Sequence, residues 1–157
     1  MLEKNQPAPV FSALNQDDEP VSLAAFSGDK NVLLYFYPKD DTPGCTIEAK
    51  QFTDLADEFS ALDTVVFGVS KDDCDSHRAF IGKYGLKVGL LADTDGDLCQ
   101  AYGVWQEKEK DGVKKMGIVR STFLINKDGV LEEALYGVSP EGHARAMLER
   151  ARLLQQA

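Results

Sequence analysis

The sequence predicts an α/β fold in which a mixed central β-sheet carries helices on both faces. Apolar runs bounded by turn residues alternate with segments of helical periodicity over residues 31–102, which is the pattern of strands joined by helices. Near the end of the chain, apolar segments on both sides of the turn 126–129 indicate an antiparallel hairpin in the same sheet. Because the 157 residues contain no internal repeat, linker or low-complexity stretch, we expect a single domain over residues 1–157.

The composition narrows the classes of partner and compartment. It is 43% hydrophobic and 27% charged, which is ordinary for a soluble globular protein, and the net charge of −9 argues against nucleic acid and anionic membranes as main partners. Residues 1–6 lack the apolar core of a secretory signal, and no apolar run approaches the roughly 20 residues of a membrane span. The sparse cysteines Cys45, Cys74 and Cys99 do not form a disulfide framework, so we expect a reducing compartment, the cytoplasm.

The N-terminal part is expected to form a short hairpin, a helical turn and a buried strand. The apolar segments 10–14 and 21–23 flank a polar loop, as in a β-hairpin, and residues 24–26 can add one helical turn. Residues 31–37 are almost entirely apolar and indicate a buried strand. That strand ends at Pro38, because proline cannot donate to a sheet ladder.

The middle of the chain is expected to alternate helices and strands. Apolar residues at helical spacing predict a helix from Glu48 to about Phe59. A second helix should begin among the N-cap candidates of residues 72–76 and run to about Tyr84, with Gly85 ending it. The other elements predicted here are two strands and a short helix, at residues 65–69, 90–91 and 98–102.

The last third is expected to supply the hairpin and a closing helix. One strand is predicted over residues 117–125, a glycine-containing turn follows, and the chain returns as a strand over 130–136. Residues 107–112 carry mixed charge and are interpreted as an exposed loop. The final helix is expected to begin at Ser139, with Pro140 at its first position.

One segment between a strand and a helix has the arrangement of a reactive-cysteine site. Pro38 ends the strand, and Thr42 has the chemistry of a helix N-cap. Pro43 suits the first helical position, so Gly44 and Cys45 fall within the first turn. The free backbone N–H groups and the positive end of the helix dipole there favour a thiolate over a thiol. The alternative is that Cys45 is a small buried hydrophobic residue, as most free cysteines are.

The neighbours of Cys45 suggest roles around its sulfur. Gly44 has no side chain, so a small substrate could approach the backbone closely. The Thr42 hydroxyl could hydrogen-bond a thiolate or a bound oxygen. Pro38 could cover the thiol and keep bulk water away.

This segment resembles the active-site signature of peroxiredoxins, Pro-x-x-x-Thr-x-x-Cys, through Pro38, Thr42 and Cys45. The wider segment 35–48 is most similar to the bacterioferritin-comigratory, or Q-type, branch of that family. The resemblance extends over essentially the whole chain and implies a thioredoxin-like fold with an N-terminal β-hairpin extension. It implies a thiol-dependent peroxidase that reduces hydrogen peroxide and organic hydroperoxides through a sulfenic acid on Cys45, with no metal and no cofactor.

The resemblance also implies an electron donor, which would be a thioredoxin, a glutaredoxin or a low-molecular-weight thiol. Because the chain lacks an obvious C-terminal swapping arm, we expect a monomer.

A thiolate that attacks a peroxide also needs a cation, because negative charge builds on the leaving oxygen. Arg120 lies within the predicted strand 117–125, where a charged residue is costly without a partner. On the pattern alone Arg120 could equally face solvent, but its segment resembles the one that supplies the active-site arginine of peroxiredoxins. Glu48 lies on the same helical face as Cys45 and could orient Arg120 or be a surface charge.

Neither histidine has the sequence pattern of a cysteine–histidine pair or a metal site. His77 and His143 are therefore both expected to be solvated helix residues.

The sulfenic acid on Cys45 must be reduced by a second thiol. Many Q-type relatives carry that thiol five residues after the reactive cysteine or in the following helix, but here these positions are Lys50 and a site near Ile81. We therefore expect an external thiol to reduce Cys45. Cys74 at a predicted helix start remains an alternative resolving residue, and Cys99 is less favoured because its segment is typical of core.

Two other functions are compatible with a thioredoxin-like fold. A disulfide oxidoreductase would need a second cysteine in a C-x-x-C arrangement, but Glu48 occupies that position. A metal-binding or holdase protein would resemble the copper-carrying relatives of the fold, which use two cysteines and a histidine, whereas this chain has Ala49 beside Glu48.

Overall fold

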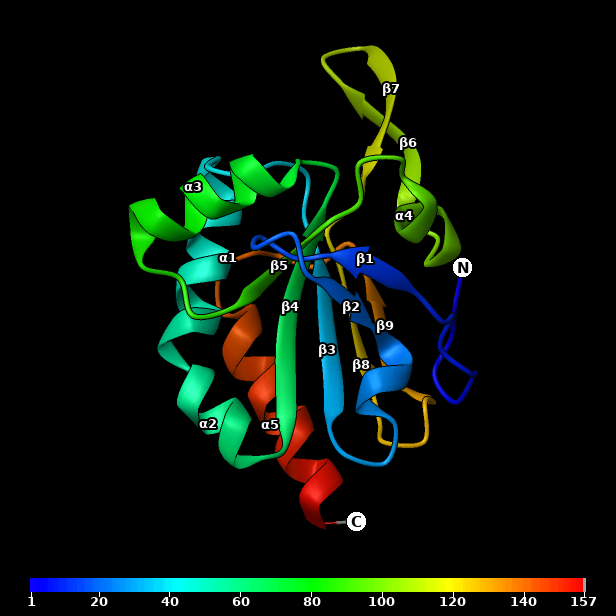
Figure 1. Ribbon diagram of the computed structural model, residues 1–157. Coiled ribbons are helices and arrows are strands. Elements are labelled where there is room, and N and C mark those ends of the chain that lie inside the picture. Colours follow the sequence, from blue (N-terminus) through cyan, green and yellow to red (C-terminus); the bar gives the residue numbers. More distant parts are fainter. Residues whose placement is uncertain (157) are drawn as a thin grey trace.

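The computed structural model describes residues 1–156 and contains a seven-stranded sheet with the order β2-β1-β5-β4-β3-β8-β9 (Figure 1). The strands are β1 Ser12–Leu14, β2 Pro20–Ser22, β3 Asn31–Phe36, β4 Thr64–Ser70, β5 Gly89–Ala92, β8 Ser121–Ile125 and β9 Leu131–Tyr136. The β3–β4 and β4–β5 pairs are parallel, whereas the β3–β8, β8–β9 and β1–β5 pairs are antiparallel. The predicted mixed sheet is confirmed, as is the N-terminal hairpin β1–β2.

Helices cover both faces of this sheet, but unequally. One face is covered by α1 (Pro43–Asp54), α2 (Ala56–Ala61), α3 (Cys74–Tyr84) and α5 (His143–Gln156), which lie on the same side in Figure 1. The other face is covered by the short 3-10 helix η1 (Leu23–Phe26), by α4 (Asp97–Ala101) and by the N-terminal segment. The sheet therefore separates two hydrophobic cores.

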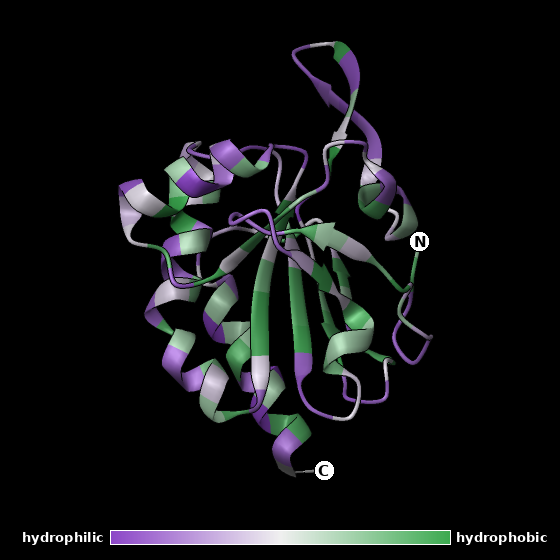
Figure 2. Cartoon of the chain, in the orientation of Figure 1, coloured by the Kyte–Doolittle hydropathy of each residue, from purple (hydrophilic) through white to green (hydrophobic). Residues whose placement is uncertain are grey.

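Strand β3 contributes to both cores. Leu33 and Tyr35 belong to the core under the four helices, whereas Leu34 and Phe36 belong to the opposite core. All four residues are fully buried, and Figure 2 shows β3 and β4 coloured as hydrophobic along much of their length. Burial on both faces explains why this strand is a continuous apolar run without polar alternation.

The predicted capping signals around α3 are confirmed. The Asp73 carboxylate accepts a hydrogen bond from the Ser76 N–H at 2.8 Å, which satisfies one of the free donors of the first turn. Gly85 ends the helix in the left-handed conformation, with φ of 62°. Asp73 is therefore the N-cap residue, and α3 begins at Cys74.

The predicted helix 48–59 is broken at Leu55. There a tight turn lets the Leu55 N–H donate to the Phe52 carbonyl and separates α1 from α2. The change of direction allows Phe52 and Phe59 to be fully buried together, with ring centroids 5.8 Å apart. Packing of these two rings is the tertiary reason for a break that helical periodicity does not reveal.

The final helix begins at His143 rather than at Ser139. Gly142 has φ of 79°, which is incompatible with a helical residue, and its N–H donates to Gln51 Oε1 on α1 at 2.8 Å. The segment from Ser139 to Gly142 is therefore a bend that packs on α1 before α5 starts.

The predicted loop 107–112 is a β-hairpin. Strands β6 (Trp105–Lys110) and β7 (Val113–Ile118) pair in a separate two-stranded sheet, which projects from the body of the molecule in Figure 1. Asp111 and Gly112 form the turn, with φ of 54° and 79°. Two successive residues with positive φ are typical of a type I′ turn, and the Asp-Gly pair is the sequence signal for it.

The predicted single strand 117–125 is two strands of different sheets. β7 ends at Ile118, β8 begins at Ser121, and Arg120 lies in the link between them. The Val119 N–H donates to the Val104 carbonyl, and the Arg120 carbonyl accepts from the Val138 N–H. Backbone hydrogen bonds therefore hold this link in place, and the Arg120 side chain does not occupy an interior strand position.

Within residues 1–156, no helix has the length and apolar character needed to cross a lipid bilayer.

Candidate active site

Cys45 lies in the first turn of α1, just beyond the carboxyl end of β3. Thr42 is the N-cap residue and Pro43 the first helical residue, as predicted. Cys45 is only 2% exposed and belongs to the core under the four helices. Its sulfur therefore combines the polar environment of a helix start with near-complete burial.

Arg120 reaches this sulfur from the link between β7 and β8. Its Nη2 donates to Cys45 Sγ at 3.4 Å, and its Nη1 donates to Glu48 Oε1 at 2.8 Å. A planar guanidinium has its donors at fixed positions, so one arginine can make both contacts at once. The structure thus brings Arg120 from a distant segment to Cys45 and Glu48 of α1, and the solvent-facing alternative for Arg120 is wrong.

Glu48 is fully buried, so the alternative that it is a surface charge is also wrong. Burial raises the pKa of its carboxyl to about 7, against the opposing effect of the Arg120 charge. Its second oxygen, Oε2, has no hydrogen-bond partner within residues 1–156, which accords with a carboxylate that is costly to ionise. Burial alone would lower the pKa of Arg120, but the charge of Glu48 and the contact with Cys45 raise it.

Tyr35 lies within the same core. Its pKa is raised well above the usual value, first by burial and then by the charges of Glu48 and Cys45. The ring stacks on Phe52 with centroids 4.7 Å apart, and a Cβ at Gly68 would lie 2.7 Å from the tyrosine Cζ. Tight packing on both sides therefore makes Tyr35 a rigid part of the core near the Cys45 sulfur.

Gly44 lies directly against the guanidinium. A Cβ at this position would be 3.2 Å from Arg120 Nη2 and 3.4 Å from Pro140 Cγ. Any side chain at residue 44 would therefore crowd the cation that contacts Cys45. The absence of a side chain, which the sequence linked to substrate access, is equally required by Arg120.

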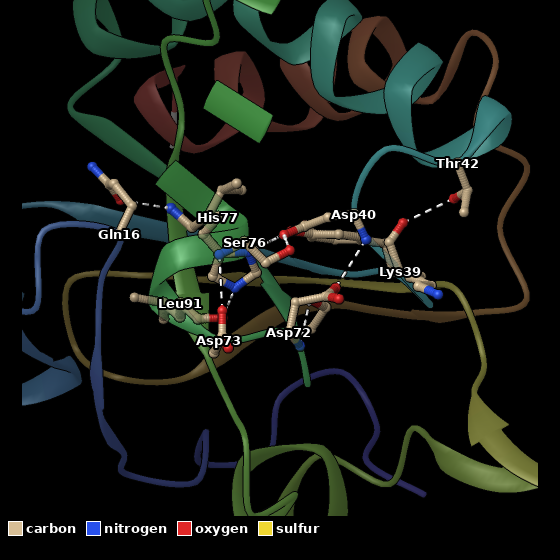
Figure 3. A network of polar contacts seen from close by, with 12 residues as sticks. Gln16, Lys39, Asp40, Thr42, Asp72, Asp73, Ser76, His77 and Leu91 are labelled. Carbon is tan, nitrogen blue, oxygen red and sulfur yellow. Dashed lines mark hydrogen bonds and ion pairs between the residues drawn. The ribbon is translucent and has the colours of Figure 1, made fainter. Parts of the chain in front are cut away.

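Thr42 uses its hydroxyl within the turn. The hydroxyl donates to the Lys39 carbonyl at 2.8 Å, as Figure 3 shows, and the side chain makes no helix-capping hydrogen bond. The hydroxyl proton thus closes the turn, and a hydrogen bond between Thr42 and a thiolate or a bound oxygen stays a prediction. Pro38 is exposed after β3, and its covering of the thiol stays a prediction.

Both histidines are buried, so the prediction that they are solvated is wrong. His77 contacts Asp40, and His143 Nε2 lies 2.7 Å from Thr122 Oγ1. Burial, followed by the charges of Arg120 and Arg150, lowers the pKa of His143 to about 4. Helical spacing was an available signal: His77 lies three residues before the buried Phe80, and His143 lies four before the buried Met147.

The two remaining cysteines differ in their relation to Cys45. Cys74 is half-buried at the first position of α3, and its pKa is raised by burial and by Asp18. Cys99 is fully buried in the core on the opposite face of the sheet, and burial together with Asp93 raises its pKa. Cys99 is therefore a core residue, as predicted, and the sheet separates it from Cys45.

Comparison with known proteins gives a consistent result. Residues 5–134 match the AhpC/TSA family. The chain is 46% identical to a putative peroxiredoxin bcp of Helicobacter pylori over 148 residues, covering 94% of this chain and 97% of that protein. It is 41% identical to peroxiredoxin Bcp of Bacillus subtilis over 148 residues, covering 94% of each.

Solved structures agree with these sequence relatives. The bacterioferritin comigratory protein of Xanthomonas campestris, studied for alkyl peroxide reduction, superposes with a TM-score of 0.87 at 35% identity, covering 92% of this chain and 91% of that one. A PrxQ mutant of Xylella fastidiosa superposes with a TM-score of 0.92 at 31% identity, covering 99% and 98%. The thioredoxin-like fold expected from the sequence is confirmed by these neighbours.

Proposed function

The chain belongs to the AhpC/TSA family, in its Bcp/PrxQ peroxiredoxin branch, and is a thiol-dependent peroxidase; from this premise we propose that Cys45 is the residue that the peroxide oxidises. One observation carries the proposal: Cys45 Sγ lies in the first turn of α1, 3.4 Å from Arg120 Nη2. Cys74 and Cys99 have raised pKa values, which makes either of them a poorer nucleophile.

The oxidation step uses the electron pair of the Cys45 thiolate. The sulfur attacks the terminal oxygen of the hydroperoxide, the S–O bond forms, and the O–O bond breaks with its electron pair on the leaving oxygen. The terminal OH group stays on sulfur as a sulfenic acid, and the leaving oxygen takes the proton that Cys45 lost on ionisation, so that water or an alcohol departs. Arg120 and the backbone N–H groups of Gly44 and Cys45 are assigned to the charge that develops on the oxygens.

Glu48 is assigned to hold Arg120 in place. Its Oε1 accepts from Nη1, so that Nη2 is directed at the sulfur. Gly44 leaves space for the guanidinium and for substrate. The Thr42–Lys39 hydrogen bond and Pro38 are assigned to the shape of the turn that precedes the helix.

The reduction step is proposed to use an external thiol. That thiol attacks the sulfenic sulfur, water departs and a mixed disulfide forms; a second thiol then releases Cys45 and leaves the donor as a disulfide. Three features favour this route: Lys50 and Ile81 replace the cysteines expected in Q-type relatives, Cys99 lies across the sheet, and Cys74 begins a regular helix. We propose a thioredoxin, a glutaredoxin or a low-molecular-weight thiol as donor.

A two-cysteine route through Cys74 is the second candidate. Helix α1 follows β3 and α3 follows β4, and these strands are parallel neighbours, so Cys45 and Cys74 both lie beyond the same edge of the sheet. In this route Cys74 displaces water from the Cys45 sulfenic acid and forms an intramolecular disulfide.

Mass spectrometry of the intact protein after one equivalent of peroxide separates the two routes. The external route predicts the gain of one oxygen and full turnover by Cys74→Ser with an added thiol. The internal route predicts the loss of two hydrogens and no turnover by Cys74→Ser with a thioredoxin-type donor. A Cys45→Ser variant that still consumed peroxide would contradict the assignment of Cys45 itself.

Further parts of the proposal concern the setting of the enzyme. We propose that residues 1–157 act as one domain, that the protein is a monomer and that it works in the cytoplasm. Sedimentation of the reduced and the oxidised protein would test the monomer, and cell fractionation would test the compartment.

A further inference from the structure

The β6–β7 hairpin begins beside the residue that contacts Cys45. The Val119 N–H donates to the Val104 carbonyl, which joins the two residues that flank the hairpin, and Arg120 is the next residue of the chain. From this base the six residues of each strand extend about 20 Å. In Figure 1 the hairpin projects beyond the same end of the sheet as α3. A protein that approaches Cys45 to reduce it therefore has this hairpin at its side.

The strand register divides the charges of the hairpin between its two faces. Directly opposite residues of an antiparallel pair share a face, and neighbours along a strand alternate between faces. One face therefore carries Lys108, Lys110 and Lys115 and no acidic residue. We call these three lysines the basic stripe. The other face carries charges of both signs, on Glu107, Glu109 and Lys114.

Lys108 fixes the end of the basic stripe that lies nearest to Arg120. Its Nζ donates to the Ile118 carbonyl at 2.8 Å, two residues before Arg120 in the chain. The side chain lies along Gly117, where a Cβ would be only 3.1 Å from Lys108 Cδ. Lys110 ends β6 beside the turn at the other end of the hairpin. The basic stripe therefore runs from the neighbourhood of the active site to the tip of the hairpin.

The basic stripe has no acidic partner within residues 1–156. All three lysines are exposed, and none of them makes an ion pair in that part of the chain. Lys108 and Lys115 lie directly opposite each other, and like charges in such a pair lower the stability of a sheet. An acidic surface placed against the stripe would offset this repulsion. The charges are therefore arranged for a partner that the protein itself does not supply.

We propose that the basic stripe is the docking surface for the protein that reduces the Cys45 sulfenic acid, and that this protein presents an acidic surface around its reactive thiol. The inference rests on the proposed external route of reduction. Because the whole chain has a net charge of −9, an extended polyanion or an anionic bilayer would be repelled by the rest of the molecule. A compact acidic protein can contact the hairpin alone, where the 54% exposed Val113 adds an apolar contact on the same face.

The test is the rate constant for reduction of the preformed sulfenic acid in the double variant Lys110→Glu, Lys115→Glu. The two probes are an acidic thioredoxin and dithiothreitol, which is uncharged. We expect reduction by thioredoxin to slow on the order of 10- to 100-fold at low ionic strength, because repulsion replaces attraction during association. The difference should shrink as ionic strength approaches about 1 M, where the Debye length is about 3 Å. Reduction by dithiothreitol and oxidation by hydrogen peroxide should stay as in the wild type.

Lys114→Glu is the matched control for the single variant Lys115→Glu. The two lysines are exposed neighbours on β7 and the substitutions change the net charge equally, but Lys114 lies on the other face, opposite Glu109. Lys115→Glu should slow reduction by thioredoxin more than Lys114→Glu does, and equal slowing would overturn the proposal. Because Lys115→Glu places a carboxylate opposite Lys108, it should not lower the thermal midpoint, so slower reduction cannot come from unfolding.

Further outcomes would also overturn the docking surface. These are an unchanged rate with thioredoxin in the double variant, an equal loss of rate with dithiothreitol, and a wild type that thioredoxin reduces no faster than dithiothreitol does. Self-association of the wild type that the double variant loses would assign the stripe to a second copy of the chain instead. If the double variant fails to fold, Lys110→Gln with Lys115→Gln gives the same comparison with a smaller change of charge. Peroxidase activity in Cys45→Ser would contradict the proposed function itself, whereas normal reduction of every lysine variant removes only the docking surface.

Discussion

Replacement of Arg120 by glutamine is the most direct test of the electrostatics of this site. The change removes the donor 3.4 Å from Cys45 Sγ and the donor 2.8 Å from Glu48 Oε1 together. At an effective dielectric constant of about 20, opposite unit charges 3.4 Å apart attract by roughly 5 kcal/mol. Only the part of this attraction that grows on the way to the transition state accelerates the reaction. Loss of one preorganised donor to a developing oxyanion costs a factor on the order of 10²–10³ in rate, and we expect that loss here.

The assay is the second-order rate constant for oxidation of reduced Cys45 by hydrogen peroxide, followed by the mass of rapidly quenched samples. Arg120→Lys should give an intermediate rate, because a single ammonium keeps the charge but cannot bridge the sulfur and Glu48 as a guanidinium does. Arg145→Gln is the matched control, since Arg145 is exposed on α5. A rate constant for Arg120→Gln equal to that of Arg145→Gln would refute the electrostatic reasoning.

The remaining predictions concern stability and space at the site. Between pH 4.5 and about 7 the folded state retains the Glu48 proton that the unfolded chain has released, so Glu48 lowers stability by about 3 kcal/mol as pH rises through that window. Folding lowers the pKa of His143 from 6.5 to about 4, so the His143 contribution to stability rises with pH over nearly the same window and opposes that of Glu48. In Glu48→Gln the free energy of urea unfolding should therefore rise with pH, whereas in the wild type the two contributions largely cancel. Curves of unfolding free energy against pH that run parallel for the two proteins would contradict this. Gly44→Ala should displace Arg120 and slow Cys45 oxidation while the thermal midpoint stays nearly unchanged, so a normal oxidation rate would count against the contact. Gly68→Ala places a Cβ 2.7 Å from Cζ of the Tyr35 ring and should lower the free energy of urea unfolding by about 1–3 kcal/mol. An unaltered urea midpoint would show that the core around Tyr35 can adjust to a methyl group without loss of stability.

Much of the fold could be predicted because its signals are local. The apolar run of β3, the N-cap Asp73 and the C-terminal Gly85 each act within a few residues, and the structure has all three as expected. The first turn of α1 follows the same logic, since Thr42 and Pro43 place Cys45 at its start. The predicted ends of helices are wrong where contacts with distant segments decide where a helix stops or starts. Examples are the break between Phe52 and Phe59 and the start of α5 at His143 instead of Ser139.

In the candidate site, too, the residues with local signals could be predicted and those that depend on distant contacts could not. Cys45 could be identified from its own segment, whereas the choice of Arg120 needed a family resemblance because a strand pattern does not reveal which way a side chain points. The burial of Glu48 and of both histidines could not be concluded from charge alone. These polar residues become buried because partners from other segments satisfy them: Arg120 for Glu48, Asp40 for His77 and Thr122 for His143.

By itself, the sequence determined which segments become most of the strands and helices and that Cys45 lies in the first turn of a helix, because backbone propensity, capping and apolar periodicity depend on near neighbours. Only the tertiary structure decided that a guanidinium 75 residues away contacts that sulfur and that α3 holds the turn before it. The free energy of those contacts depends on burial and on distance through space, and neither quantity is defined until the sheet and its helices have packed.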